Sequence, residues 1–410
     1  MKLALGTEGY STAVLRKAMR LVARAPSFKE ASDDLRELLQ VALSPSHLGK
    51  LAARIGGEWG AVRQADIQDF KDRKAEPQYA EAPQAAAVMV DGGTLQARAA
   101  GQPRGVHEVG WREFKAACLQ TLASKASAVD PQPEPPAKFL DPPRAARLAA
   151  EIKARRKPRK RRAAKPAGEP SKPRRRKGKR AGPRPLVRTV LASMACSDDF
   201  GWQVATEVQR RGLHRAKRKG YVCDGQKYNW SIYEMHLVML GFIGILDFIH
   251  LLSYLYWAAQ ALQGKGTAAA WACYERWLRW AWAGQVGELL GELRAGSARL
   301  GKPPDDCAED DPRQVLAEAV GYVQNNRQRM DYPRYRQLGL PISSAPVEST
   351  IKQLNRRVKG TEKFWLEGGA EALLLLRAAH LSGDGTAQRY WERPRPYARA
   401  VGAKRLRPVA

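Results

Sequence analysis

Apolar residues recur at helical spacing through the first 75 residues. Ser27 and Glu30 have the spacing of a capping box, and Phe28, Ala31, Leu35, Leu38 and Leu39 then share one side of a helix. Ser44-Pro45 begins a second predicted helix, with an apolar side formed by Leu48, Leu51, Ala52 and Ile55. His47, Lys50 and Arg54 share its outer side. Residues 1–75 are therefore predicted to form either a helix-turn-helix that contacts DNA through these three residues or a plain helical hairpin with a solvated face.

Shorter apolar runs, typical of strands, follow this helical region. The run AAAVMVDGG ends at Asp91-Gly92-Gly93 and predicts a central strand that meets a tight turn; TLQARA and WREFKAACLQTLA follow it. Further along, PLVRTVLASMA, RKGYVCDG and GFIGILDFIH predict more strands, and SDDFGWQVATEVQRRGL predicts an amphipathic helix after the first of them. Strands mixed with helices in this way predict an α/β fold with a mixed sheet.

Residues 251–330 have a helical pattern throughout and are rich in tryptophan: Trp257, Trp271, Trp277, Trp280 and Trp282. We interpret these rings as helical core rather than as a platform for base stacking. The apolar stretch 237–262 resembles a membrane span. Asp247 and His250 lie near its middle, however, and a charge there costs about 2.5–3.5 kcal/mol on insertion scales. A buried strand that runs into a core helix is the better interpretation, and a membrane-associated basic protein is the alternative.

The charge of the chain indicates a polyanionic partner. The 410 residues carry a formal net charge of +29, with 70 lysines and arginines against 41 acids. Residues 127–185 are rich first in proline and then in arginine and lysine, so we expect a disordered linker that tethers DNA phosphates. The five cysteines are scattered, and the apolar run before Gly6 is too short for a signal peptide, which predicts a cytoplasmic, nucleoid-associated protein.

Three acids stand out as candidates for a metal site. Asp91 and Asp224 each close a strand-like run before a glycine, and Glu348 lies in the first turn of the predicted helix PVESTIKQLNRRVKG. Carboxylates that converge from distant segments can hold two Mg²⁺ ions roughly 3.5–4 Å apart. Each acid also has a simpler explanation: Asp-Gly is a common hairpin turn, and Glu348 and Lys352 have the spacing of a helical ion pair.

The same late helix has an apolar stripe formed by Val347, Ile351, Leu354 and Val358. The polar residues of this helix are the predicted DNA contacts: Lys352, Asn355, Arg356, Arg357 and Lys359. A metal-binding acid beside a basic row suits a DNA strand that lies along the helix.

Several blocks resemble those of bacterial insertion-sequence DDE transposases, the IS-Kra group in particular. They are VDGGTLQAR with WREFKAACL, VCDGQKYNW with GILDFIH, and LGLPISSAPVESTIKQLNRRVKG, in the order of that family. The resemblance covers most of the chain except the basic linker. It implies an RNase H-like core interrupted by a helical insertion, with Asp91, Asp224 and Glu348 as ligands of Mg²⁺ or Mn²⁺. Asp247 and His250 match the family's DFxH block and are expected to brace the core or contact DNA, although Asp247 remains an alternative second catalytic acid.

The expected organisation has seven segments: helical 1–75, core 84–126, linker 127–185, core 186–250, helical insertion 251–330, core 331–385 with the catalytic Glu, and a basic tail 386–410. The resemblance implies metal-dependent cleavage and strand transfer of double-stranded DNA at the terminal inverted repeats of an element and at its target, carried out by a homodimer. PISSAPVES lacks the glycines usual in that block, and Gln226 replaces a small residue. A domesticated, catalytically inactive DNA-binding protein is therefore the alternative.

Overall fold

A mixed six-stranded sheet forms the centre of the computed structural model, which describes residues 9–79, 81–99, 101–102, 110–156, 182–360 and 362–393. The strands are β1 (Ala85–Ala97), β2 (Trp111–Ala123), β3 (Arg184–Ser193), β4 (Arg218–Cys223), β5 (Ile243–Leu246) and β6 (Phe364–Trp365). Their order is β3-β2-β1-β4-β5, with β6 paired to the far end of β1. The pairs β1–β2 and β2–β3 are antiparallel, whereas β1–β4 and β4–β5 are parallel. The predicted α/β class is confirmed.

The tight turn predicted at Asp91-Gly92-Gly93 is wrong. Strand β1 continues through these residues and includes most of the separately predicted run TLQARA, with Gly92 opposite Lys115 and Gly93 opposite Phe114. The glycines have a packing role instead. A Cβ on Gly93 would collide with the ring of Phe114, and one on Gly92 would lie 2.9 Å from the hydroxyl of Tyr228. Close approach of a neighbouring strand at Gly93 and of helix α6 (Lys227–His236) at Gly92 therefore explains the two glycines.

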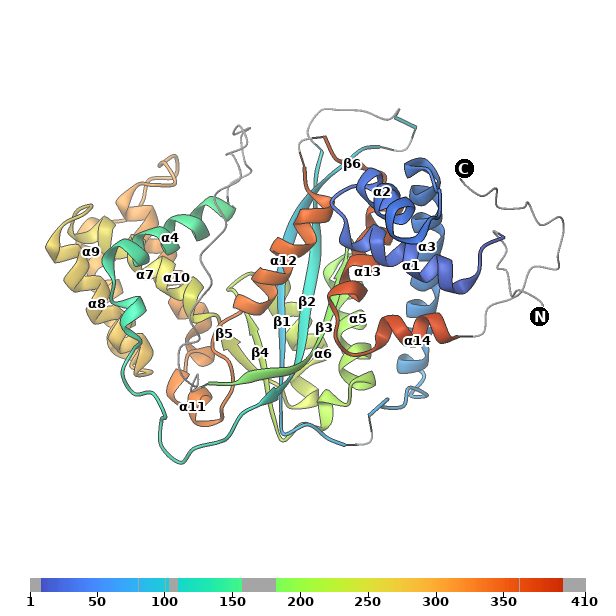
Figure 1. Ribbon diagram of the computed structural model, residues 1–410. Coiled ribbons are helices and arrows are strands. Elements are labelled where there is room, and N and C mark those ends of the chain that lie inside the picture. The colour runs from blue at the N-terminus through green and yellow to red at the C-terminus, as the bar shows by residue number, and fades with distance from the viewer. Residues whose placement is uncertain are drawn as a thin grey trace.

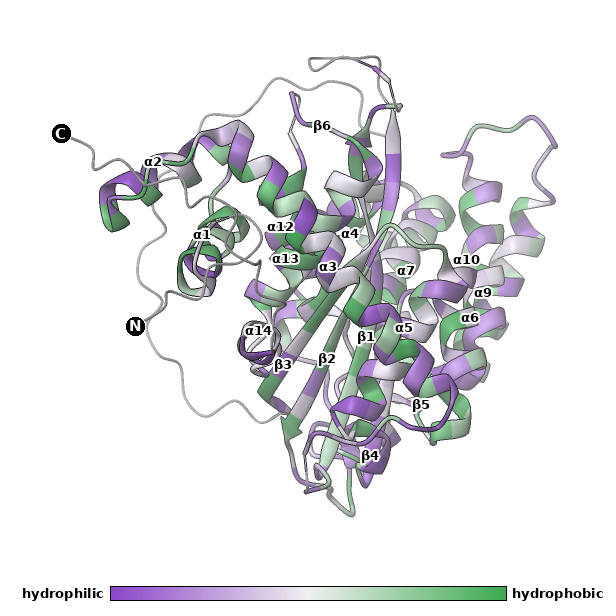
Figure 2. Cartoon of the chain, turned by 90° about the vertical axis from the view of Figure 1, so that its right-hand side faces the viewer, coloured by the Kyte–Doolittle hydropathy of each residue, from purple (hydrophilic) through white to green (hydrophobic). Residues whose placement is uncertain are grey.

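Helices cover both faces of the sheet, as Figures 1 and 2 show. Helices α12 (Ala345–Val358) and α13 (Glu367–Leu381) pack on one face, against β1 and β3 respectively. Helices α5 (Ser197–Arg210) and α6 (Lys227–His236) lie on the other. The buried residues of the helices on both faces, such as Val347 and Leu354 of α12, join those of the strands in one apolar core.

The N-terminal region is helical, as predicted. It contains α1 (Thr12–Arg24), α2 (Phe28–Leu39) and α3 (Pro45–Lys71), and the predicted caps Ser27 and Ser44 accept hydrogen bonds from the backbones of Glu30 and His47. Helix α3 is much longer than expected and packs against α13, where the Cα–Cβ region of Ala372 leaves no room for a side chain at Gly56. Whether α2 and α3 act as a helix-turn-helix stays a prediction.

A helical bundle lies beside the sheet, on the side opposite α1 to α3 (Figure 1). It contains α7 (Phe248–Gln263), α8 (Ala268–Trp282), α9 (Val286–Leu300) and α10 (Pro312–Asn326), and the short helix α11 (Tyr332–Gln337) follows it. The predicted helical character of this region is confirmed, although the first helix begins at Phe248 rather than at residue 251. Its role as an insertion into an RNase H-like core stays a prediction. Trp277 and Trp282 are buried in it and the other three tryptophans are half-buried, in agreement with a core role.

The linker prediction is wrong for its first part. Residues 137–139 form a 3₁₀ turn, and α4 (Pro142–Arg156) packs against α7, where the carbonyl of Ala149 accepts hydrogen bonds from Ser253 and Trp257. The buried residues Ala145, Ala149 and Ile152 provide apolar surface that composition alone did not reveal. The most basic part of the linker, residues 157–181, and the tail beyond residue 393 lie outside the described residues. The predicted basic tail 386–410 is wrong at its start, where Thr386–Glu392 form the short helix α14.

The predicted strand GFIGILDFIH is only four residues long. Strand β5 ends at Leu246, and Asp247 caps helix α7, which starts at Phe248. The apolar stretch 237–262 is thus a strand that runs into a core helix, as predicted. No helix within the described ranges is long and apolar enough to cross a membrane.

Candidate metal site

Acidic side chains gather where the parallel strands β1 and β4 lie side by side. Met89 of β1 pairs with Val222 of β4, and two residues beyond these partners lie Asp91 and Asp224. Asp224 follows the last residue of its strand, as predicted, whereas Asp91 lies within β1. Glu348 approaches from the first turn of α12, which packs on β1. The charges of Asp224 and Glu348 both raise the pKa of Asp91, so all three predicted ligands lie in one neighbourhood. Among the described residues, however, the group whose ligand atoms lie within 4.8 Å of one another contains Glu348 but neither Asp91 nor Asp224.

Asp91 shows the electrostatic consequence of this convergence. Burial and the nearby carboxylate of Asp224 raise the pKa of Asp91 to about 7, with Glu348 adding to the rise and His250 opposing it. The backbone N–H of Gly92 donates a hydrogen bond of 2.7 Å to Asp91, which favours the charged form but does not offset the repulsion. The surroundings of Asp91 thus disfavour its charged form.

Asp224 is held by its own turn. One carboxylate oxygen accepts hydrogen bonds from the backbone N–H of Gln226 at 3.2 Å and from the side-chain amide of Asn229 at 2.8 Å. Asn229 is fully buried and lies in α6. The side chain of Asp224 is therefore fixed in orientation through Oδ1, in the manner expected for a preorganised ligand.

Asp247 is bound far more completely. One of its oxygens accepts from the backbone N–H groups of Ile249 at 2.6 Å and His250 at 3.4 Å. The other accepts from the backbone N–H of Ser344 at 2.9 Å and from the Ser344 hydroxyl, and lies 3.2 Å from His250 Nδ1. Although burial alone would raise it, these contacts hold the pKa of Asp247 below its usual range. Asp247 is thus a compensated buried carboxylate.

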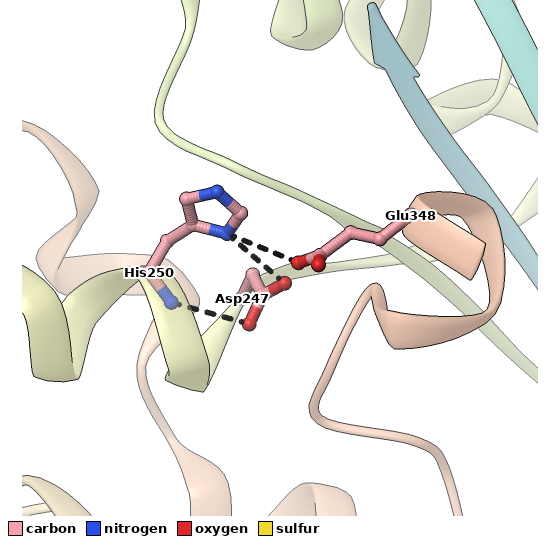
Figure 3. Close-up of side chains that lie close together, drawn as sticks. All are labelled: Asp247, His250 and Glu348. Carbon is pink, nitrogen blue, oxygen red and sulfur yellow. Dashed lines mark hydrogen bonds and ion pairs between the residues drawn. The ribbon is translucent and has the colours of Figure 1, made fainter. Parts of the chain in front are cut away.

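The imidazole of His250 faces the carboxylates of both Asp247 and Glu348, as Figure 3 shows. Its Nδ1 is 4.0 Å from a carboxylate oxygen of Glu348. Burial would lower its pKa, but the hydrogen bond and charge of Asp247, with Asp224 and Glu348, raise the pKa of His250 to about 9. Asp247, His250 and Glu348 offer ligand atoms within 4.8 Å of one another, so this buried cluster could hold a metal ion.

The backbone around Asp247 connects the segments that carry the site. Its N–H donates to the carbonyl of Cys223, the residue before Asp224, at 2.8 Å. Its side chain binds Ser344, whose carbonyl accepts the backbone N–H of Glu348 at 3.2 Å. Because β5 ends at residue 246, Asp247 and His250 of the next helix turn can both face the site. Asp247 therefore joins the end of β4 to the starts of α7 and α12.

The predicted DNA contacts on α12 divide into two groups. Lys352 and Arg356 are exposed, Asn355 is half-buried, and Lys359 donates a 3.0 Å hydrogen bond to Thr94. The prediction for Arg357 is wrong, because its side chain is only 1 % exposed and donates to the carbonyls of Val22 and Pro26. Arg357 fastens α12 to the N-terminal helices and is closed to DNA.

The three basic residues predicted on α3 are less available than expected. His47 is half-buried and lies 3.2 Å from the hydroxyl of Tyr10, and Arg54 pairs with Glu58 at 3.9 Å. Lys50 is exposed. The outer side of α3 therefore presents less positive charge than its sequence indicates.

Sequence reasoning missed three residues that support the acids: Asn229, Ser344 and Tyr322. Tyr322 of α10 is in contact with the backbone at Gly225 and stacks on Tyr254 at 3.7 Å, so the helical bundle closes one side of the site. A buried Asn one turn after Asp-Gly and a Ser just before Ala-Pro are the signals that could have indicated the first two. Tyr322 carries no such local signal, because its role depends on the docking of the bundle.

No protein-family profile matches this chain, and a search of characterised proteins found no significant match. The geometry of the site is therefore the basis for the functional conclusion.

Proposed function

We propose that this protein is a metal-dependent DNA strand-cleaving and strand-joining enzyme, a transposase of the DDE type. The single observation that carries the proposal is the proximity of Asp91, Asp224 and Glu348, where burial and then the charges of Asp224 and Glu348 raise the pKa of Asp91 to about 7. Enzymes accumulate such uncompensated acids where a cation binds, since the cation supplies the missing positive charge.

The donor set fits Mg²⁺ or Mn²⁺. All three proposed ligands supply carboxylate oxygens, which these hard cations prefer, and they come from β1, the end of β4 and the start of α12. His250 is a poorer ligand, since it would have to lose a proton that Asp247 stabilises. Two bound ions would activate the attacking oxygen and stabilise the leaving oxygen of a phosphodiester.

The sheet supports the same proposal. Three antiparallel strands followed by two parallel ones, with acids on the central strand and its parallel neighbour, fit the RNase H-like core expected from the resemblance. The late helix α12 then contributes the third acid. We assign the bundle α7 to α10 to the helical insertion of that core.

The protein's own residues would orient the acids and the DNA. Asn229 and the Gln226 N–H fix Asp224, while Asp247 fixes Ser344 and His250 and so positions the first turn of α12. Protonated His250 offsets part of the negative charge beside Glu348. Lys352 and Arg356, exposed on α12, would hold phosphates of the strand next to the site. Double-stranded DNA, both element ends and target, is the proposed substrate, and a homodimer the proposed assembly.

The second candidate is a DNA-binding protein without catalytic activity. The departures PISSAPVES and Gln226 from the family blocks favour it. The retained proximity of three acids from distant segments favours the enzyme, because a binding protein gains nothing from their repulsion.

Cleavage of DNA that contains the sequences flanking this gene, with and without Mg²⁺ or Mn²⁺, tests the proposal. Asp91→Asn, Asp224→Asn and Glu348→Gln should each abolish nicking while DNA binding persists. Glu113→Gln is the matched control: its carboxylate lies next to Gly92, and therefore on the face of β1 opposite to the Asp91 side chain. A wild-type protein that binds the DNA but leaves it intact with either metal would support the inactive alternative.

A further inference from the structure

A cavity of about 520 Å³ lies among α1, α3, α13 and α14. These elements are on the side of the sheet away from the helical bundle, so the cavity is separate from the acids described above (Figure 1). Its lining includes Arg16, Lys17 and Arg20 of α1, His380 of α13, and the rings of Trp59 and Trp391. We call it the α1 cavity.

The charge of the α1 cavity has one sign. Among the described residues that line it, the titratable ones are all basic and none is acidic. Helix α1 carries no acid between Thr12 and Arg24, and its cations Arg16, Lys17 and Arg20 are exposed. Burial lowers the pKa of His380, and the cations Arg377, Arg20 and Arg24 lower it further. Several guanidinium groups therefore add to the positive potential around His380.

The α1 cavity also offers aromatic surface. Trp59 is stacked on Tyr390, with ring centroids 4.0 Å apart and planes only 3° from parallel. Trp391 meets Tyr390 edge-on at 5.2 Å. Both tryptophans are largely buried, with 7 % of Trp59 and 9 % of Trp391 exposed, and both line the cavity. The volume of the cavity is within the range of pockets that take small ligands. Cations at the rim with rings inside are the combination that binds a nucleotide, phosphate outside and base within.

We infer that the α1 cavity binds a nucleotide unit of DNA, with the phosphates at Arg16, Lys17 and Arg20 and an unstacked base against Trp59 and Trp391. The inference rests on the proposed function, since the DNA would be the flank of the molecule that is cut at the acids. The inference places the main DNA contact of the N-terminal helices on α1. The sequence had predicted this contact on α3, where Glu58 pairs with Arg54.

A salt titration of DNA binding tests the phosphate contacts. The triple variant Arg16→Gln, Lys17→Gln, Arg20→Gln should make the slope of log K against log salt shallower by about 2 to 3, because each phosphate that a cation neutralises on duplex DNA accounts for about 0.9 of that slope. The matched control is Arg294→Gln, Arg299→Gln, Lys302→Gln, which removes the same charge from exposed positions at the end of the bundle. Equal slopes for the two triple variants would overturn the inference.

A second variant tests the base-binding part without changing charge. Ala387→Trp places a ring in the lining of the α1 cavity and should weaken binding to a duplex with a single-stranded overhang about tenfold, since stacking of one base has about this effect. Binding to a blunt duplex should change little. A thermal melt verifies that the variant is folded. Equal losses for both DNAs, or no loss for either, would exclude an unstacked base in the cavity.

Two further ligands distinguish DNA from other sources of the same chemistry. dAMP alone should compete with the overhang DNA only weakly, because a single nucleotide lacks the neighbouring phosphates. Competition at micromolar dAMP would assign the cavity to a free nucleotide. Competition by phosphatidylserine vesicles, if it disappears in the first triple variant, would assign the cavity to a membrane surface. Either result would overturn the inference. If wild-type protein cleaves DNA yet the triple variant keeps its salt slope, only the α1 cavity assignment fails. If wild-type protein neither binds nor cleaves DNA, the proposed function fails with it.

Discussion

Asp91 is half-buried and Asp247 is fully buried, and the surroundings of these two acids in one small region are opposite. Burial and the charges of Asp224 and Glu348 raise the pKa of Asp91 to about 7, and the hydrogen bond from Gly92 only partly opposes this rise. Asp247 receives donors from Ile249, His250 and Ser344 on both oxygens, and its pKa falls. The difference separates two functions: an acid whose charge the protein leaves uncompensated is available to a cation, whereas an acid whose oxygens are occupied holds the structure together.

The largest expected effect is the loss of DNA cleavage when Asp91 is replaced. Asp91→Asn removes a proposed metal ligand and should lower metal-dependent cleavage by on the order of 10³-fold or more, as several kcal/mol of charge stabilisation disappear. The fold should be retained or become more stable, because the substitution relieves repulsion with Asp224. Nicking rates measured beside thermal melts test both halves. A variant that still cuts at the wild-type rate would remove Asp91 from the site.

The next largest expected effect is a loss of stability when Asp247 is replaced. Asp247→Asn replaces an oxygen that accepts from His250 or Ser344 with an amide that donates, and should destabilise the protein by about 3 kcal/mol. Asp224→Asn is the matched comparison, since the remaining oxygen can still accept from Asn229. It should change stability by less than about 1 kcal/mol and abolish cleavage.

Denaturant unfolding, a gel shift and a cleavage assay on both variants decide between the two acids. A stable, DNA-binding but inert Asp247→Asn protein, together with an Asp224→Asn protein that still cuts, would make Asp247 the second catalytic acid and reverse our assignment.

A smaller effect is the pH dependence that Asp91 imposes on the metal-free protein. Its pKa is about 7 in the folded chain against a usual 3.8, so the folded state holds a proton that the unfolded state has lost between these values. Stability should therefore fall as pH rises from about 4 to 7, by on the order of a few kcal/mol, and then level off.

Mg²⁺ should reverse this loss at pH 8 and have little effect at pH 5, where protons compete with the ion. Melting curves of wild-type and Asp91→Asn proteins with and without Mg²⁺ isolate the contribution of Asp91. If the two proteins show the same pH profile without metal, the acids do not repel one another as described.

The sequence predicted the parts of this site that depend on local pattern. The strand-like run before Asp224 and the amphipathic pattern around Glu348 place these two acids correctly, and Asp91 lies on a strand as expected although not at its end. The helical bundle was expected from its periodicity. The predicted turn at Gly92 was wrong, because the two glycines make room for the ring of Phe114 on the neighbouring strand and for the hydroxyl of Tyr228 on helix α6. Such contacts join residues far apart in the chain and leave no local signal.

Arg357 and the predicted linker also show that the sequence does not reveal contacts between distant segments. From the sequence, Arg357 on its basic helix has the pattern of a DNA contact, but in the structure the N-terminal helices cover it. Residues 142–156 likewise have the composition of a charged linker, but they form α4, which packs on α7. Helical pattern fixes which side of a helix is apolar, but not which polar residues a distant segment will bury.

The smallest expected effect contrasts two cations of α12, Lys352 and Arg357. Lys352 is exposed, so Lys352→Gln should leave stability within about 0.5 kcal/mol of wild type and make the salt slope of DNA binding shallower by about 0.9, as for one phosphate contact. Arg357→Gln removes the same charge but also the hydrogen bonds to Val22 and Pro26, so it should destabilise the fold and leave the slope of the folded protein unchanged. Salt titrations at a temperature where both variants are folded make the comparison direct. A shallower slope for Arg357→Gln than for Lys352→Gln would mean that α12 presents its buried side to DNA, after the N-terminal helices move away.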